Sequence, residues 1–350
     1  MDRRSFLRLA MAAGASVGIA GRVRPTLAAG GATIGLSNGY FGTEWRNQMV
    51  AGAEEEFAKY KAQGRVEKLI VQQAGADTNQ QIADIRNMIQ AGVSVITVNA
   101  NSATALNGVI NEAQRAHIPV VSFDQRVTNP YALNVTVDHY TWGQRYAKWI
   151  AETLGGKGKV VVMDGLAGHP AAEARRQAAL DTFRQYPGIE VVWSGYGDWD
   201  HAKAQAVMAT VIAAQPQIDA VFVEDSMGLG VLRAFQNAER PIPVMTGEAQ
   251  KAFLLAWKAA LGKGIAMKAF VQPNPPDISR NAIGVAVRLA EGKKLKSIPE
   301  NTIFYPIQLK VTRDNLDEVL SAMADKPDSY FLAEWFSEQQ LDGYFESSHA

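Results

Sequence analysis

The stretch QQIADIRNMIQAGVSVITVNAN (80–101), followed by AHIPVVSFDQR (116–126), decides the fold. Isoleucines recur at helical spacing in the first part of it and lead directly into the apolar, β-branched run VSVITVN (93–99). The run IPVVSFD (118–124) repeats that pattern after another helix-like segment. Continuous apolar strands that alternate with helices are typical of parallel sheets covered on both faces.

The same alternation continues on both sides of this stretch. A helix is predicted over 44–60 and another over 77–91, because apolar residues recur there at i+3 and i+4. Further strand-like runs lie at 32–37, 66–72, 159–164, 189–194, 219–224 and 242–247. The sequence therefore predicts an α/β fold with parallel sheets.

Eight such units could form one barrel of about 250 residues or two separate sheets. Two observations favour two lobes. The series of strand–turn–helix units begins anew after LNVTVDHYTWG (133–143). Polar residues also stand at the ends of strands in both halves, namely Asn99, Asp124, Asp164 and Asp225. Because open α/β sheets bind ligands beyond the carboxyl ends of their strands, two facing sheets would form a cleft.

The N-terminus has the features of an export signal. Arg3 and Arg4 precede Ser5-Phe6-Leu7, a weakly apolar stretch follows over 9–20, and small residues stand at 28–30. Residues 1–29 are therefore predicted to be a twin-arginine signal peptide of a periplasmic protein. The alternative interpretation is a basic tail.

Composition excludes several classes of function. The chain has no cysteine, so it has no disulfide, thiolate zinc site, cysteine nucleophile or lipidated N-terminus, and its five histidines are scattered. We expect no metal and no cofactor.

Charge and hydropathy argue against two kinds of partner. Removal of residues 1–28 takes away five of the 35 basic and one of the 35 acidic residues, which leaves a net charge of −4. That balance argues against nucleic acid as a partner. After the signal, no run of 18 apolar residues predicts a membrane span.

Five segments in order carry a resemblance to a known family: the two stretches quoted first, then GLAGHPAAEARRQAAL (165–180), GDWDHAKA (197–204) and MGLGVLRAF (227–235). Over about residues 32–312 the chain resembles the sugar-binding proteins of ABC importers, including those for ribose and galactofuranose, in the type I periplasmic binding protein family. This resemblance implies two Rossmann-like lobes, joined by three hinge crossings, that close over one sugar.

The resemblance also implies domain boundaries. The crossings would lie near Val137–Asp138, Gln272–Pro273 and Gln308–Leu309. The N-lobe would then comprise 32–137 plus 273–308, the C-lobe 138–272 plus 309–340, and a tail 341–350. The segment SYFLAEWFSEQQLDGYFESS (329–348) receives no functional interpretation.

Sugar recognition needs aromatic planes for the ring faces and charged groups for the hydroxyls. By the resemblance, Trp45 and Trp199 would cover opposite ring faces, and the pair Trp45-Arg46 is similar to that of furanose-binding members. Asp124 and Arg175 match a carboxylate and an arginine of the family. The alternatives are core packing for Trp45 and helix capping for Asp124.

Other positions match the family less directly. Asn99 and Gln272 match amides. Asp225, with Glu224 as the second choice, matches a polar contact after a strand, and Glu248 is the only acid in TGEAQ (246–250).

One position departs from the family. The family's arginine follows the aspartate directly, whereas this chain has Gln125 there and Arg126 one residue later. Either Arg126 turns into the site or the ligand needs an amide instead.

These features predict a monomeric periplasmic receptor that binds a monosaccharide or polyol and presents it to a membrane permease of an ABC importer. The Trp-Arg pair and Gln125 favour a furanose or small branched sugar over plain ribose. The alternatives are a signalling receptor on the same fold and a glycoside-processing enzyme. No GxxxxGK[ST], GxGxxG or GxSxG motif supports an enzyme.

Overall fold

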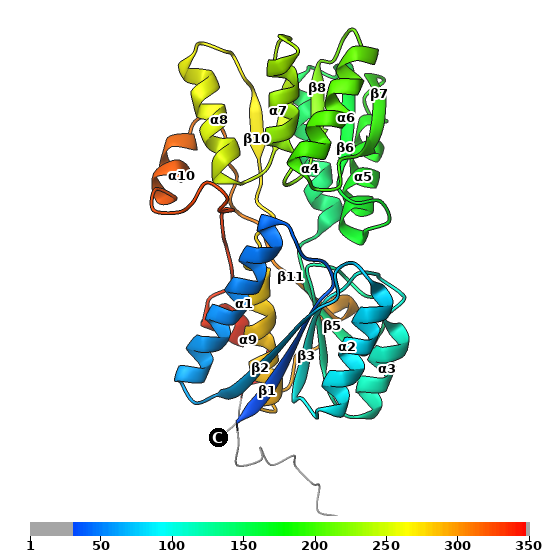
Figure 1. The fold of residues 1–350 in the computed structure, drawn as a ribbon, viewed down its shortest axis with the longest axis vertical. Coiled ribbons are helices and arrows are strands. Elements are labelled where there is room, and N and C mark those ends of the chain that lie inside the picture. Colours follow the sequence, from blue (N-terminus) through cyan, green and yellow to red (C-terminus); the bar gives the residue numbers. More distant parts are fainter. Residues whose placement is uncertain (1–30, 348–350) are drawn as a thin grey trace, which may run out of the picture.

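The computed structural model describes residues 31–347, so the predicted signal peptide lies outside the described residues. Two parallel sheets form two lobes, one above the other in Figure 1. The N-lobe sheet has the order β11-β5-β4-β3-β1-β2, and the C-lobe sheet has the order β10-β9-β8-β6-β7. The predicted α/β fold with two parallel sheets is confirmed.

The elements have the following bounds. The N-lobe contains β1 (Ala32–Asn38), α1 (Glu44–Ala62), β2 (Val66–Gln73), α2 (Thr78–Gln90), β3 (Val95–Asn99), α3 (Asn107–Arg115), β4 (Val120–Phe123), β5 (Ala132–Thr136), α9 (Ile278–Ala290), β11 (Thr302–Phe304) and α11 (Glu338–Asp342). The C-lobe contains α4 (His139–Thr153), β6 (Lys157–Asp164), α5 (Pro170–Phe183), β7 (Gly188–Tyr196), α6 (His201–Ala214), β8 (Ala220–Val223), α7 (Gly228–Asn237), β9 (Val244–Gly247), α8 (Lys251–Gly262), β10 (Ala269–Val271) and α10 (Leu316–Ala322).

The central strands of each sheet are covered on both faces, which explains why strands such as β3, β4 and β8 are buried along their whole length. In the N-lobe, α1 and α9 contribute to one hydrophobic cluster, and α2 and α3 to another. In the C-lobe, α4 and α5 pack on one face, while α6, α7 and α8 pack on the other. The parallel register places Asn38 opposite Asn99, so polar residues gather at the carboxyl edge of the N-lobe sheet.

The chain passes between the lobes after β5, after β10 and after β11, where Val311 bridges to Val271 of β10. It then passes a fourth time, which the sequence analysis did not anticipate. The prediction assigned residues up to 340 to the C-lobe and 341–350 to a tail. The structure instead buries Phe331, Phe336, Leu341 and Phe345 in the N-lobe core.

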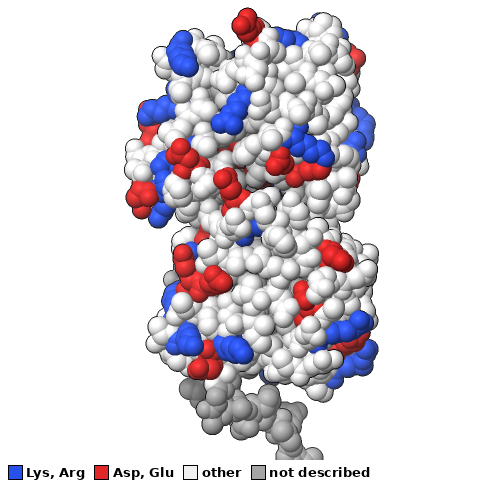
Figure 2. All heavy atoms as spheres, viewed as in Figure 1, with Lys and Arg blue, Asp and Glu red and all other residues white. Residues whose placement is uncertain are grey.

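Surface charge is mixed. Figure 2 shows acidic and basic side chains interspersed over both lobes on the face in view. Within residues 31–347, no helix combines the length and the hydropathy needed to cross a bilayer.

Candidate ligand-binding site

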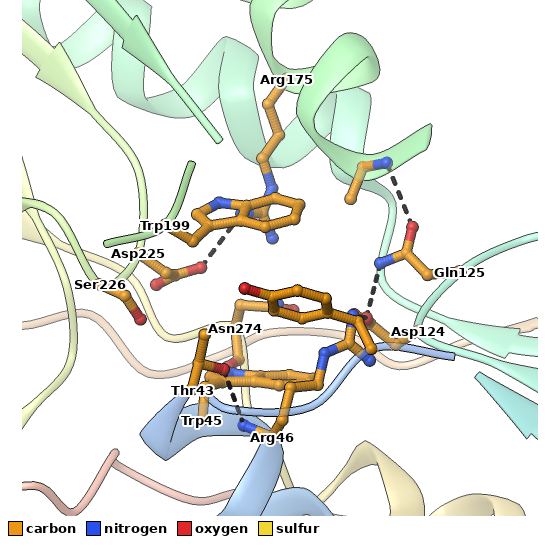
Figure 3. Close-up of a pocket in the computed structure, with 12 residues that line it drawn as sticks. Thr43, Trp45, Arg46, Asp124, Gln125, Arg175, Trp199, Asp225, Ser226 and Asn274 are labelled. Carbon is orange, nitrogen blue, oxygen red and sulfur yellow. Dashed lines mark hydrogen bonds and ion pairs between the residues drawn. The ribbon is translucent and has the colours of Figure 1, made fainter. Parts of the chain in front are cut away.

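A pocket lies between the two lobes, at the carboxyl edges of both sheets. Its empty volume is about 400 Å³, including space open to solvent. The lining residues come from both lobes (Figure 3): Tyr40, Thr43, Trp45, Arg46, Asp124, Gln125 and Asn274 from one side, and Ala171, Arg175, Trp199, Asp225 and Ser226 from the other.

Backbone geometry at the pocket is unusual. Asp124, Trp199 and Ser226 all have positive φ, at 59°, 52° and 58°. Non-glycine residues rarely adopt this region, and such residues concentrate at functional sites. Trp199 also requires Gly165, because a Cβ at that position would lie 2.0 Å from the indole.

Trp45 and Arg46 form the N-lobe wall together. The Thr43 side chain caps α1 by accepting from the Arg46 N–H at 3.3 Å, which places both residues in the first turn. The Trp45 indole donates to the Asn274 carbonyl at 2.8 Å, and the Arg46 guanidinium lies 5.1 Å from its ring centroid. Trp45 belongs to the N-lobe core and also lines the pocket, so it packs as the alternative expected, while its contact with a ligand stays a prediction.

Asp124 completes this wall. Its carboxylate accepts from Gln125 Nε2 at 2.6 Å and lies 3.9 Å from Arg46 Nη2. Burial by itself would raise the pKa of Asp124, but Arg46, His139 and the Gln125 amide together hold that pKa below its usual value. Asp124 is therefore a carboxylate.

The C-lobe wall is built around Arg175 of α5. Its Nη1 lies 3.1 Å from Asp225 Oδ2 and 3.4 Å from Glu224 Oε2, and its guanidinium stacks 4.1 Å from the Trp142 ring centroid. The Trp199 indole donates to Glu224 Oε2 at 3.0 Å. Burial raises the pKa of Glu224 and of Asp225 to about 7, although Arg175 opposes both shifts.

Asp164 lies behind this wall at the end of β6. Burial, aided by Glu224, raises the pKa of Asp164 to about 9, even though Arg176 Nε lies 3.1 Å from Oδ2. Arg176 is close enough for an ion pair, but neither Asp164 oxygen has a hydrogen-bond partner among the described residues. The cost of desolvating the carboxylate therefore outweighs the attraction of Arg176.

His139 is a residue that the sequence analysis missed. Its Nε2 lies 3.1 Å from the Asp124 carbonyl, and its Nδ1 lies 3.2 Å from Arg175 Nη2. Since an arginine only donates, Nδ1 accepts and Nε2–H donates to the carbonyl. Burial, with Arg175, lowers the pKa of His139 to about 4, so the ring is neutral near pH 7. Its place directly after the first hinge crossing was the available signal.

Gln125, and not Arg126, faces the pocket. The Gln125 amide donates to Asp124 and its Oε1 accepts from the Ala171 N–H at 3.3 Å, which joins the lobes. Arg126 points away, pairs with Glu300 at 2.7 Å and lies over Phe304. The structure thus corrects the prediction for Arg126, because adjacent side chains leave this segment in different directions.

Three other predicted residues do not line the pocket. Asn99 lies behind it and accepts from Arg46. Glu248 accepts from the N–H groups of Gly228 and Leu229, at 2.5 and 3.1 Å, and so caps α7. Gln272 is buried and lines a separate hollow near the hinge. Asn274 and Ser226, which do line the pocket, carried no sequence signal. Over residues 31–347, no group of three or more His, Asp or Glu side chains is placed to hold a metal ion.

Two α/β lobes with a pocket between their carboxyl edges define the fold of a two-lobed, type I periplasmic binding protein. The comparisons agree. The periplasmic binding protein domain family matches residues 34–294, and the chain belongs to this family.

Relatives extend the match. The ribose import binding protein RbsB of Bacillus subtilis (strain 168) is 28% identical over 283 residues, which cover 80% of this chain and 88% of that protein. An ABC transporter solute binding protein from Thermobispora bispora DSM 43833 has a TM-score of 0.79 at 28% identity. The match covers 89% of this chain and 94% of that protein. An ABC transporter periplasmic solute binding protein from Actinobacillus succinogenes 130z, solved with bound D-allose, has a TM-score of 0.70 at 27% identity. That match covers 82% of this chain and 99% of that protein.

Proposed function

We propose that this protein is a solute-binding protein that captures a neutral monosaccharide or polyol for an ABC-type importer, without catalysing a reaction on it. The observation that carries the proposal is a set of polar atoms on residues lining the pocket. Arg175 Nε, Asp225 Oδ1 and Asn274 Oδ1 are buried and have no hydrogen-bond partner among the described residues. A buried polar atom left unpaired costs about 1–3 kcal/mol, so a ligand with several hydroxyls would relieve that cost.

The charges that line the pocket support a neutral ligand. Arg46 and Arg175 are matched by Asp124 and Asp225, so an acidic or basic solute would meet no unbalanced partner. The indoles of Trp45 and Trp199, one from each lobe, offer surfaces for the apolar faces of a sugar ring. The ribose and allose named for the relatives support the same ligand class.

The amide of Gln125 narrows the class of sugar that the pocket is expected to bind. Where the family has an arginine, this pocket has a neutral amide that already bonds Asp124 and the Ala171 N–H. We therefore expect a pentose, a furanose or a related polyol that is not plain ribose.

The finer parts of the proposal concern location and use. The protein would reach the periplasm by twin-arginine export, act as a monomer, and close its lobes around the ligand because the ligand contacts both. The closed form would then be recognised by a membrane permease.

The test is a thermal-shift screen of residues 30–350 against pentoses, hexoses, furanose forms and polyols. A ligand at 100 times its Kd stabilises the folded state by about 2.7 kcal/mol, which raises Tm by a few degrees. A shift confined to one sugar class supports the proposal. No shift with any sugar overturns the ligand class.

Calorimetry with the sugar that gives the shift then tests the site. Trp45→Ala should weaken binding at least tenfold, or about 1.4 kcal/mol. Tyr131→Ala is the control, because Tyr131 is an exposed aromatic residue of the same lobe that lies outside the pocket. Equal affinity in the two variants would remove Trp45 from the site.

A further inference from the structure

The segment after α10 forms a fourth connection between the lobes. We call residues 325–346 the C-terminal strap. It begins 31 residues beyond the end of the family match at residue 294. In Figure 1 it descends, in red, from α10 on the C-lobe towards α1 and α9 on the N-lobe.

The strap is hydrogen-bonded to the C-lobe at the start of α8. The N–H groups of Lys251 and Ala252 donate to the carbonyls of Tyr330 and Asp328, both at 2.9 Å. These are first-turn N–H groups, and Gln250 offers α8 no side-chain cap. Leu332 N–H donates to the Ala249 carbonyl at 2.8 Å, so the strap both caps α8 and pairs with the residues before it.

Phe331, which lies between Tyr330 and Leu332, is hydrogen-bonded to the N-lobe on the opposite edge of this segment. Gln48 of α1 donates to the Phe331 carbonyl at 2.9 Å and accepts from the Phe331 N–H at 2.8 Å. Neighbouring residues of an extended segment direct their backbone groups to opposite edges. Residues 330 and 332 therefore bind the C-lobe while residue 331 binds α1, and the Phe331 side chain is buried in the N-lobe core.

Beyond this point the strap is anchored firmly on the N-lobe. The buried Arg288 of α9 lies 2.9 Å from Glu338 and 2.9 Å from Asp342, and Tyr60 donates to Glu338 at 2.6 Å. Glu334 accepts from the Tyr305 hydroxyl at 3.1 Å and from the Leu309 N–H at 3.2 Å, both in the third hinge crossing. The strap thus contacts the C-lobe, the hinge and the N-lobe in turn.

The strap also lies close to the ligand pocket. Gln250, which bridges to Phe331, donates to the carboxylate of Glu44 across the lobes. Glu44 directly precedes Trp45 and Arg46 in the first turn of α1. Any separation of α8 from α1 must therefore break the Gln48–Phe331 pair or pull the strap from one lobe.

We propose that the C-terminal strap restrains the opening of the cleft and so sets how much of the ligand-free protein is already closed. Resting on the proposed function, this would raise affinity, because apparent Kd improves with the fraction of molecules in the binding-competent state. The strap would be an affinity-setting element supplied from outside the matched domain.

The experiment measures lobe separation without ligand, so its result does not depend on which solute binds. The chain has no cysteine, so spin labels can be attached at Ala83→Cys on α2 and Ala209→Cys on α6, both exposed. Distances between the labels are then measured by double electron–electron resonance. Gln48→Ala should add a population with longer distances than the wild type.

The matched control is Asn47→Ala, an exposed neighbour on α1 that does not line the pocket. A second variant combines Gln48→Ala and Phe331→Ala with a protease site inserted after Ala333 and cleaved in the folded protein, which removes the Phe331 anchor and severs the strap between its remaining anchors on the two lobes. Longer distances in either variant, with Asn47→Ala unchanged, support the proposal. Wild-type distances in both variants overturn it, whether or not a sugar is found to bind.

Discussion

The two walls of the pocket differ in how their charges are balanced. In the N-lobe wall, one cation, Arg46, is paired with one carboxylate, Asp124, which also accepts a hydrogen bond from the Gln125 amide. In the C-lobe wall, Arg175 faces both Glu224 and Asp225, and each carboxylate keeps one oxygen without a partner. The N-lobe wall is thus preorganised, whereas the C-lobe wall carries the cost of desolvated charge that a ligand could relieve.

The largest expected effect comes from removing the one cation of the C-lobe wall. Arg175→Ala leaves Glu224 and Asp225 buried beside each other without a counter-charge. Loss of one partner of a buried ion pair typically costs about 3–5 kcal/mol. We expect the free energy of unfolding to fall by that order in urea titrations, and sugar affinity to fall at least tenfold, about 1.4 kcal/mol.

Arg184→Ala is the control for this prediction. Arg184 follows α5 directly, is largely exposed and pairs only locally with Asp181, so its loss should change stability by less than about 0.5 kcal/mol. Equal losses in the two variants would contradict the view that the C-lobe wall depends on Arg175.

The second prediction concerns pH. A carboxyl group whose pKa is higher in the folded state keeps its proton on folding, so stability falls as pH rises between the unfolded and the folded pKa. Glu224 and Asp225 titrate near 7, whereas Asp164 titrates near 9. Between pH 7 and 9 the free energy of unfolding should therefore fall by roughly 1 kcal/mol per unit, mainly through Asp164.

Asp164→Asn should flatten that slope in urea titrations at pH 7, 8 and 9. Asp181→Asn, a change at a surface carboxylate, should keep it. If the slope of Asp164→Asn remained parallel to that of the wild type, the raised pKa of Asp164 would be refuted.

A third, smaller effect is expected at His139, which joins the two walls. His139→Ala removes a donor to the Asp124 carbonyl and an acceptor for Arg175, which should cost about 1–3 kcal/mol. His139→Asn should recover part of this, because an amide has both a donor and an acceptor. Nitrogen NMR of the wild type should show a neutral ring with its proton on Nε2, and a proton on Nδ1 would exclude the bridge.

The smallest expected effect is that of Arg126→Ala, which we compare with Gln125→Ala. Arg126→Ala should leave sugar affinity unchanged and alter stability by less than about 0.5 kcal/mol, because its partner Glu300 is exposed. Gln125→Ala should weaken binding, since it removes the amide between Asp124 and α5. Isothermal titration of both variants checks this, and a loss only in Arg126→Ala would reverse the assignment.

Much of the fold could be predicted from the sequence. Helices expected over 44–60 and 77–91 appear as Glu44–Ala62 and Thr78–Gln90. Buried strands of five or more residues, such as β1 and β3, are visible in the sequence as apolar runs. The three-residue strands β10 and β11 were missed, because three residues are too few to display a period. The course of 331–345 was also missed, since its apolar residues are packed individually and not as one stripe.

The site was less predictable. Residues that directly follow a strand or lie in the first two turns of a helix, such as Asp124, Arg175 and Trp45, were placed at the pocket because secondary structure fixes their position. Arg126 was misplaced because a positive φ at Asp124 redirects the chain, and sequence spacing does not reveal that. Asn274 and Ser226 enter the pocket from loops whose positions depend on tertiary packing.

The strap has a consequence for synthesis of the chain. All five C-lobe strands lie in one continuous stretch, from Lys157 to Val271, whereas the N-lobe needs β11 and then Phe336, Leu341 and Phe345 to fill its core. During translation the strands of the second lobe are complete while the first still lacks part of its core. The lobe that begins the chain is therefore the one that finishes folding last.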